Sequence, residues 1–204
     1  MLLLVSGATK TLEAYPHPRL GRLIVPKAQN RPTALNLQPR RWAGDNGAFS
    51  AFDERAFLRM LDQFQGIPGC LFVTAPDVVG NATDTLRLFA HWESLIHRMN
   101  YPVAFVLQDG LEARQIPWRS CEAVFVGGTT EFKLGRPVRS FVGYARALGR
   151  WVHMGRVNSV KRLTYAAEIG CQSVDGTKYS RWPKVHLPLA IRTLNEIQSR
   201  LRLQ

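Results

Sequence analysis

Residues 171–181 read CQSVDGTKYSR, and this stretch decides the fold that we predict. We interpret its first five residues, of which Cys171 and Val174 are apolar, as a short buried strand that delivers Asp175 to its end. Gly176 follows, and then a polar, basic loop. A carboxylate at the C-terminal tip of a strand is where α/β barrels carry their chemistry. A lone Asp-Gly pair is more often only a turn, so the prediction depends on the pattern recurring elsewhere.

The pattern recurs along the whole chain. Apolar runs that predict strands lie at 2–6, 23–25, 41–45, 70–75, 103–107, 123–126, 151–154 and 171–175. Helical patterns follow most of them, at 53–64, 82–99, 137–148, 159–169 and 188–201. Strands that alternate with helices indicate a parallel sheet, and continuous apolar strands indicate that both of its faces are buried.

Eight such units predict one domain, residues 1–204, folded as a compact (β/α)8 TIM barrel. We expect the helices after the first, second and fifth strands to be short or missing. An open, doubly wound sheet is the alternative. It is less favoured because no GxGxxG motif follows the first strand.

The composition limits the protein class. The 204 residues are 46% hydrophobic, which suffices for a core, and no run of 18 apolar residues predicts a membrane span. Three cysteines lie far apart, at 70, 121 and 171, without a CxxC pair. This argues against a disulfide framework and against a thiolate-rich zinc site, so we expect reduced thiols in a cytoplasmic protein.

The charge points to a polyanionic partner. Lys and Arg number 27 against 15 Asp and Glu, which gives a net charge of +12. Nucleic acid is the simplest partner for such a chain, although a basic surface without a partner is the alternative. The basic residues are spread along the sequence, so we expect a charged face and not a disordered arm.

Polar residues follow almost every predicted strand. In a barrel these strand ends converge on one mouth, although any one of the residues alone is more often a turn former or a cap. They are Asp45, Asp77, Gln108, Asp109, Gly127, Gly128, Glu131, Arg156 and Asp175.

This set suits chemistry at a sugar carbon. One carboxylate can attack or shield the developing oxocarbenium ion while another exchanges a proton, and their mutual repulsion raises at least one pKa. Gly127 and Gly128 offer backbone N–H groups to the edge of a flat heterocycle. Gln108 supplies a donor and an acceptor together, which fits the edge of a nucleobase.

In the same order and with similar spacing, these motifs resemble those of the tRNA-guanine transglycosylase superfamily, including its DNA-modifying branch in phages and bacteria. The family's Asp-Ser-Gly-Gly-Phe-Gln signature is matched by DNGAFS at 45–50. VLQDG at 106–110 matches the segment with its base-reading Gln. HMGRV at 153–157 resembles its Leu-Met-Gly-Val-Gly strand. The resemblance covers residues 41–181.

The resemblance implies a (β/α)8 barrel that replaces guanine in nucleic acid by a free 7-deazaguanine base, without a cofactor, through a covalent intermediate. It makes Asp175 the nucleophile and Asp45 the general acid/base. The implied base-binding residues are Asp77, Gln108, Gly127, Gly128, Glu131, Phe49 and Met154. Beside the mouth, we expect phosphate contacts from Arg156, Lys178, Arg181 and Lys184.

The sequence departs from the family in two respects. The tRNA enzymes carry a Cys/His zinc site after the barrel, and this chain has a final helix instead, so we expect no metal. We also favour DNA over tRNA as the substrate. The expected location is the host cytoplasm, in a phage-like setting. Asn46 and Ala48 replace Ser and Gly of the signature, which leaves the identity of the base open.

Other functions remain as alternatives. A base-excising N-glycosidase would resolve the intermediate with water. A non-catalytic barrel would bind nucleic acid as the partner of a larger modifying protein. A phosphate-sugar isomerase or aldolase is less favoured, because no strand carries a Schiff-base lysine and no clear phosphate-binding glycine loop is present.

Overall fold

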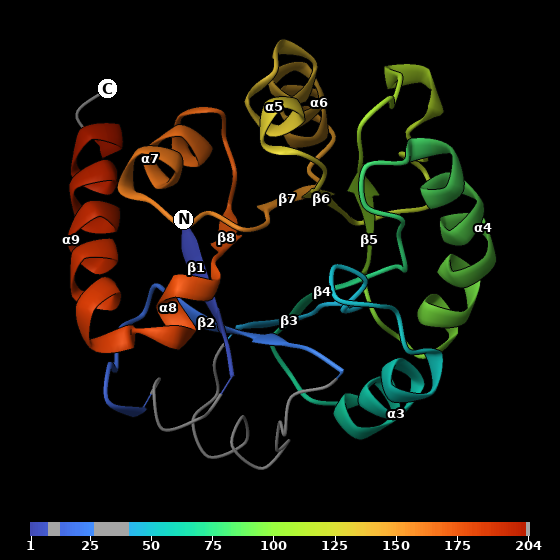
Figure 1. The fold of residues 1–204 in the computed structure, drawn as a ribbon, viewed down its shortest axis with the longest axis horizontal. Helices are drawn as coiled ribbons and strands as arrows, with labels where there is room; N and C mark the ends of the chain where they lie inside the picture. Colours follow the sequence, from blue (N-terminus) through green and yellow to red (C-terminus); the bar gives the residue numbers. More distant parts are fainter. Residues whose placement is uncertain (8–12, 27–40, 203–204) are drawn as a thin grey trace.

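The computed structural model describes residues 1–7, 13–26 and 41–202, and its eight strands form a closed barrel (Figure 1). All neighbouring strands are parallel and follow the order of the sequence, and β8 pairs with β1. The fold is therefore a compact (β/α)8 TIM barrel, as predicted. The strands are β1 (Leu2–Ser6), β2 (Leu20–Ile24), β3 (Trp42–Gly44), β4 (Cys70–Thr74), β5 (Val103–Leu107), β6 (Ala123–Val126), β7 (Trp151–Met154) and β8 (Ser173–Asp175).

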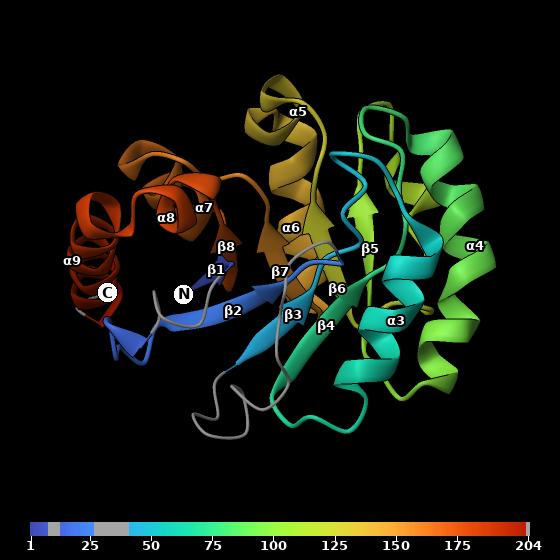
Figure 2. The ribbon, with the colours of Figure 1, turned by 60° about the horizontal axis from the view of Figure 1, so that its bottom comes forward.

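Helices surround the strands, with α7 and α9 on one side of the barrel and α3 and α4 on the other (Figures 1 and 2). They are α3 (Glu54–Phe64), α4 (Ala82–Arg98), α5 (Thr130–Leu134), α6 (Arg136–Ala147), α7 (Val160–Glu168), α8 (Thr177–Arg181) and α9 (Pro183–Arg202). Between β5 and β6 the chain forms only the 3-10 turn η1 (Ala113–Gln115), which confirms that the helix after the fifth strand is short or missing. The segments after β1 and β2, where we expected short or missing helices, lie partly outside the described residues.

Polar side chains start three of the helices where the sequence predicts. Asp53 caps α3 by accepting a hydrogen bond from the Ala56 N–H, and Ser159 caps α7 in the same way. Asn81 caps α4 by accepting from Asp84 N–H. Each cap satisfies a backbone donor that has no partner inside the helix.

Two predictions at the C-terminal end were wrong. The segment after Gly176, predicted as a loop, forms the short helix α8, and the last helix begins at Pro183 instead of Pro188. Proline favours the first turn of a helix, so Pro188 suggested a start. Pro183 already occupies the first position, and Pro188 is accommodated within the helix.

Side chains alternate between the barrel interior and the helical layer. Leu4, Ala43, Phe72 and Ala104 belong to the cluster inside the barrel. The rings of Phe72 and Phe125 meet His153 there, with centroids 5.3 and 4.6 Å away. The interior is thus a packed core beneath the mouth, as the layered filling of such barrels requires.

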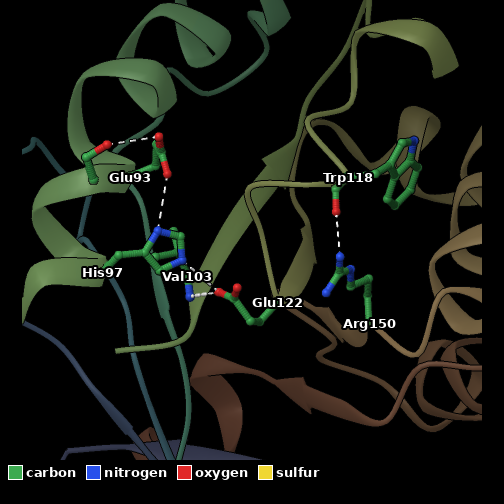
Figure 3. A network of polar contacts seen from close by, with 7 residues as sticks. Glu93, His97, Val103, Trp118, Glu122 and Arg150 are labelled. Carbon is green, nitrogen blue, oxygen red and sulfur yellow. Dashed lines mark hydrogen bonds and ion pairs between the residues drawn. The ribbon is translucent and has the colours of Figure 1, made fainter. Parts of the chain in front are cut away.

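The opposite end of β5 and β6 is held by polar contacts (Figure 3). His97 lies between two carboxylates, 3.2 Å from Glu93 and 3.0 Å from Glu122, and Glu122 also accepts from the Val103 N–H at 2.8 Å. Burial raises the pKa of Glu122, but the Val103 amide and His97 outweigh it, so the pKa lies below its usual range. This network links α4 to the start of β5 and serves the fold.

Within the described ranges, no helix combines the length and the apolar character that a membrane crossing needs.

Candidate active site at the mouth of the barrel

A narrow pocket opens at the C-terminal ends of the strands. Its volume is about 80 Å³, and it is lined by residues that come from widely separated parts of the chain. They include Asp45, Asp77, Gln108, Gly127, Gly128 and Asp175. The predicted convergence of these residues on one mouth is therefore confirmed, and their chemical roles stay predictions.

A wider cleft adjoins this pocket. Its volume is about 390 Å³, within the range of about 300–1,000 Å³ typical of ligand sites. Asp45, Phe49, Arg156 and Asp175 line both spaces, whereas Arg181 lines only the cleft. A ligand can therefore place a flat group in the pocket and extend past the two carboxylates into a space bordered by arginines.

Asp45 follows β3 directly. The pairing of β3 with β4 shifts register between Trp42 and Gly44, and such irregularities often re-aim a side chain next to a site. Asp45 Oδ1 accepts from the Gly47 N–H at 3.1 Å. Burial raises the pKa of Asp45 to about 7 against this hydrogen bond, and the nearby charges of Asp175 and Asp77 raise it further. Asp45 can thus both give and take a proton near neutral pH.

Asp77 is held by two amides. Gln108 Nε2 donates to its Oδ2 at 2.5 Å and Asn46 Nδ2 donates to its Oδ1 at 2.7 Å. Gln108 Oε1 accepts from the Gly80 N–H at 2.9 Å, so the amide orientation of Gln108 is fixed from both ends. Burial raises the pKa of Asp77, although the two amide hydrogen bonds oppose it.

The two glycines after β6 are required by close packing. A Cβ on Gly127 would lie 2.7 Å from Val106 Cγ1, and one on Gly128 would lie 2.5 Å from Asp109 Oδ2. Gly128 also has a φ of +74°, which side chains disfavour. The backbone at this wall of the pocket therefore carries no side chain. The Gly127 N–H already donates to the Leu107 carbonyl at 3.0 Å, so the expectation that it faces a heterocycle is wrong.

Asp175 ends β8 and is 9% exposed. Its Oδ1 accepts from the Arg156 N–H at 3.3 Å, and its Oδ2 lies 3.0 Å from His153 Nε2. Arg156 has a φ of +62°, unusual for a residue with a side chain, and this turn aims its amide at the carboxylate. Both carboxylate oxygens of Asp175 are thus held in place.

Four predicted site residues lie outside both cavities. Glu131 is exposed in the first turn of α5, and Lys178 and Lys184 are exposed and do not line the cleft. Met154 is buried in the helical layer. Successive side chains of a strand point to opposite faces, and because His153 points into the barrel, Met154 points out of it.

Two further polar residues, which the sequence analysis did not name, line the narrow pocket. Lys133 of α5 donates from Nζ to the Gly155 carbonyl at 3.0 Å. Burial lowers the pKa of Lys133 to about 8, while the charge of Asp175 opposes this shift. Thr74 ends β4 and is 1% exposed, and its Oγ1 has no hydrogen-bond partner among the described residues.

His153 lies in the HMGRV segment, and its contact with Asp175 cannot be predicted because nothing in the sequence reports which buried group touches that carboxylate. Across the described part of the chain, no three His, Cys, Asp or Glu side chains are grouped so as to hold a metal ion.

Comparison with known proteins adds no family. A scan against protein-family models finds no match to the chain, and a search of curated proteins finds no significant relative. The function is therefore argued from the site itself.

Proposed function

We propose that this protein is a pentosyltransferase that replaces guanine in nucleic acid, DNA in preference to tRNA, by a free 7-deazaguanine base. The observation that carries the proposal is the narrow pocket in which Asp45, Asp77, Gln108 and Asp175 meet beside a wider, arginine-bordered cleft. The motif resemblance supports the guanine and 7-deazaguanine identities, and the net charge of +12 supports the polyanionic substrate.

The nucleophile of the proposed reaction is Asp175. Its oxygen attacks C1′ of the target nucleotide, and the electrons of the C1′–N bond leave with guanine. Asp45 gives its proton to the departing base and then, as a carboxylate, takes the N–H proton of the incoming base. That base attacks C1′ and releases Asp175, so two displacements retain the configuration at C1′.

The binding groups fit a purine. The Asp77 carboxylate accepts from ring or exocyclic N–H groups, and Gly127 and Gly128 expose backbone at the pocket wall. The target base has to leave the stack to enter the pocket, which costs a few kcal/mol. The Lys133 ammonium limits the repulsion among three neighbouring carboxylates, because it lines the same pocket.

The test is exchange of radiolabelled guanine into DNA and into tRNA by the purified protein. The wild type is expected to incorporate label into DNA, and Asp175→Asn is expected to abolish incorporation and the covalent adduct seen on denaturing gels. Undiminished exchange by Asp175→Asn would refute the covalent role. Guanine release without incorporation would identify a glycosidase. Salt-dependent binding without either reaction would identify a non-catalytic barrel.

A further inference from the structure

We propose that a buried hydrogen-bond relay, Trp151–Ser173–His153, orients the Asp175 carboxylate, which makes His153 a positioning residue. The inference rests on the proposed role of Asp175 as the nucleophile. The relay connects neighbouring strands β7 and β8 inside the barrel and ends at the mouth.

Three contacts form the relay. Trp151 Nε1 donates to Ser173 Oγ at 2.8 Å. Ser173 Oγ lies 2.8 Å from His153 Nδ1, and His153 Nε2 lies 3.0 Å from Asp175 Oδ2. Trp151, His153, Ser173 and Asp175 alternate along their strands, so all four point to the same side of the sheet.

The direction of the relay follows from the donor inventory. An indole N–H only donates, so Ser173 Oγ accepts from Trp151 and its own hydroxyl proton is free to donate to His153 Nδ1. The neutral imidazole then carries its proton on Nε2 and donates it to Asp175. A proton on Nδ1 would leave the Ser173 hydroxyl proton without an acceptor among the described contacts, which is costly for a fully buried group.

Serine, histidine and aspartate also make up the catalytic triads of hydrolases, but here their order is reversed. In a hydrolase the serine faces the substrate and the aspartate lies behind the histidine. Ser173 and His153 are both 0% exposed, whereas Asp175 lines the pocket and the cleft. His153 therefore has no route to a substrate proton, and the group presented to the substrate is the carboxylate.

His153 is also fixed against rotation. Its ring packs against both Phe72 and Phe125, which also contact each other, in the barrel interior. On the other oxygen, the Arg156 amide holds Asp175 at 3.3 Å. A nucleophile held from both sides attacks from one geometry, and a misplacement of about 1 Å costs about 100-fold in rate.

The relay itself is tested without an activity assay. In protein with ¹⁵N-labelled histidine, the two ring nitrogens of His153, assigned by their loss in His153→Phe, are expected to report a neutral ring protonated on Nε2. Ser173→Ala removes the donor to Nδ1 and is expected to shift the Nδ1 signal. A wild-type ring protonated on Nδ1, or an unchanged Nδ1 signal in Ser173→Ala, would overturn the relay.

The positioning role is tested by kinetics. His153→Phe keeps the aromatic packing and removes the donor to Asp175, so kcat for exchange is expected to fall about 100-fold while the KM for the free base stays within about twofold. His153→Gln retains an acceptor and a donor and is expected to recover part of the loss. Equal loss in both variants, or a loss in KM alone, would overturn the role.

Tyr101→Phe is the matched control. It removes another buried hydrogen bond, from Tyr101 Oη to the Leu61 carbonyl at 2.6 Å, away from the mouth. It should lower stability without changing kcat. If the wild type shows no base exchange, the proposed function fails, whereas the ring-nitrogen signals still decide whether the relay exists.

Discussion

The guanidinium of Arg156 lies over the ring of Phe49, with its carbon 3.7 Å from the ring centroid. Both residues line the narrow pocket and the cleft, and Phe49 is 62% exposed. An exposed aromatic ring under a cation at this border suits contact with a base and its phosphate.

Arg156→Gly should weaken DNA binding without lowering the stability of the fold. Arg156 has a φ of +62°, a conformation that costs a non-glycine residue about 1–2 kcal/mol, so glycine should leave the free energy of unfolding unchanged or raise it by about 1 kcal/mol. Loss of the guanidinium should weaken binding to a DNA oligonucleotide and reduce the slope of log K against log salt by about 1.

Two variants serve as controls for this prediction. Arg156→Lys keeps the charge and should keep the salt slope. Arg87→Ala removes an exposed arginine that pairs with Asp84 on α4 and should leave DNA binding unchanged. An unaltered salt slope in Arg156→Gly would remove Arg156 from the nucleic-acid contact.

Thr74 and Thr85 allow a matched comparison of two buried hydroxyls. Each is 1% exposed, but Thr74 Oγ1 has no partner in the described structure, whereas Thr85 Oγ1 accepts from the Val78 N–H at 3.0 Å. Thr74→Val should therefore stabilise the fold by about 1 kcal/mol, because an unsatisfied polar group is removed. It should also weaken binding of the free base, because the pocket loses a hydroxyl group that the base could pair with. Thr85→Val should destabilise the fold by a similar amount.

Denaturant unfolding and calorimetric titration with free 7-deazaguanine check the pair. If Thr74→Val destabilises the fold as Thr85→Val does, the Thr74 hydroxyl has a partner in the free protein. If base affinity is unchanged, the hydroxyl does not meet the ligand.

The barrel could be predicted because its signals are local. Most strands are apolar runs, and helix starts are marked by residues such as Asp53 and Ser159. The mouth could be predicted from topology, because parallel strands end on one face. This brings Asp45 and Asp175 together although they lie 130 positions apart in the sequence.

The remainder of the site depends on packing that sequence patterns do not carry. Lys133 looks like an ordinary helical lysine, and only the placement of α5 over Gly155 turns it into the pocket. The partner of His153 depends on the register between β7 and β8. Strand periodicity places Met154 on the face of β7 opposite to His153, outside the pocket. The short helix α8 lacks the length at which an apolar period becomes visible.

Comparing Gly128→Ala with Gly66→Ala distinguishes the cost of a steric clash from the cost of backbone strain. Both have a positive φ, +74° and +76°, but a Cβ on Gly66 meets nothing within 4 Å, whereas one on Gly128 would lie 2.5 Å from Asp109 Oδ2 and 2.8 Å from Phe132 Cδ1. Gly66→Ala should cost about 1 kcal/mol from strain alone. Gly128→Ala should cost more and weaken base binding.

Thermal unfolding and base titration of the two variants test this. Equal destabilisation would mean that the loop at Gly128 moves to accommodate the methyl group. Weaker base binding in Gly66→Ala as well would show that the loss reflects general instability.

Asp45→Asn should abolish base exchange and raise the free energy of unfolding by an amount that grows with pH. The pKa of Asp45 is about 7 in the folded protein, mainly because of burial, against an ordinary value of 3.8. Between these pH values the folded state retains a proton that the unfolded chain has lost, so the contribution of Asp45 to stability falls as pH rises and is fully lost above about pH 7. At about 1.4 kcal/mol per pH unit, the loss has an upper limit of about 4 kcal/mol.

Asparagine carries no charge, and its carbonyl can still accept from the Gly47 N–H. Asp45→Asn should therefore exceed the wild type's free energy of unfolding by up to about 2 kcal/mol at pH 5 and by up to about 4 kcal/mol at pH 8.5. Base exchange should be lost at both pH values. Urea unfolding at the two pH values measures the difference, with the exposed Asp62→Asn as control. A gain in the free energy of unfolding that is equal at pH 5 and pH 8.5 would mean that Asp45 does not ionise in this range. Base exchange that survives in Asp45→Asn would assign the acid/base role to another group. Asp77 is then the first candidate, because burial raises its pKa as well.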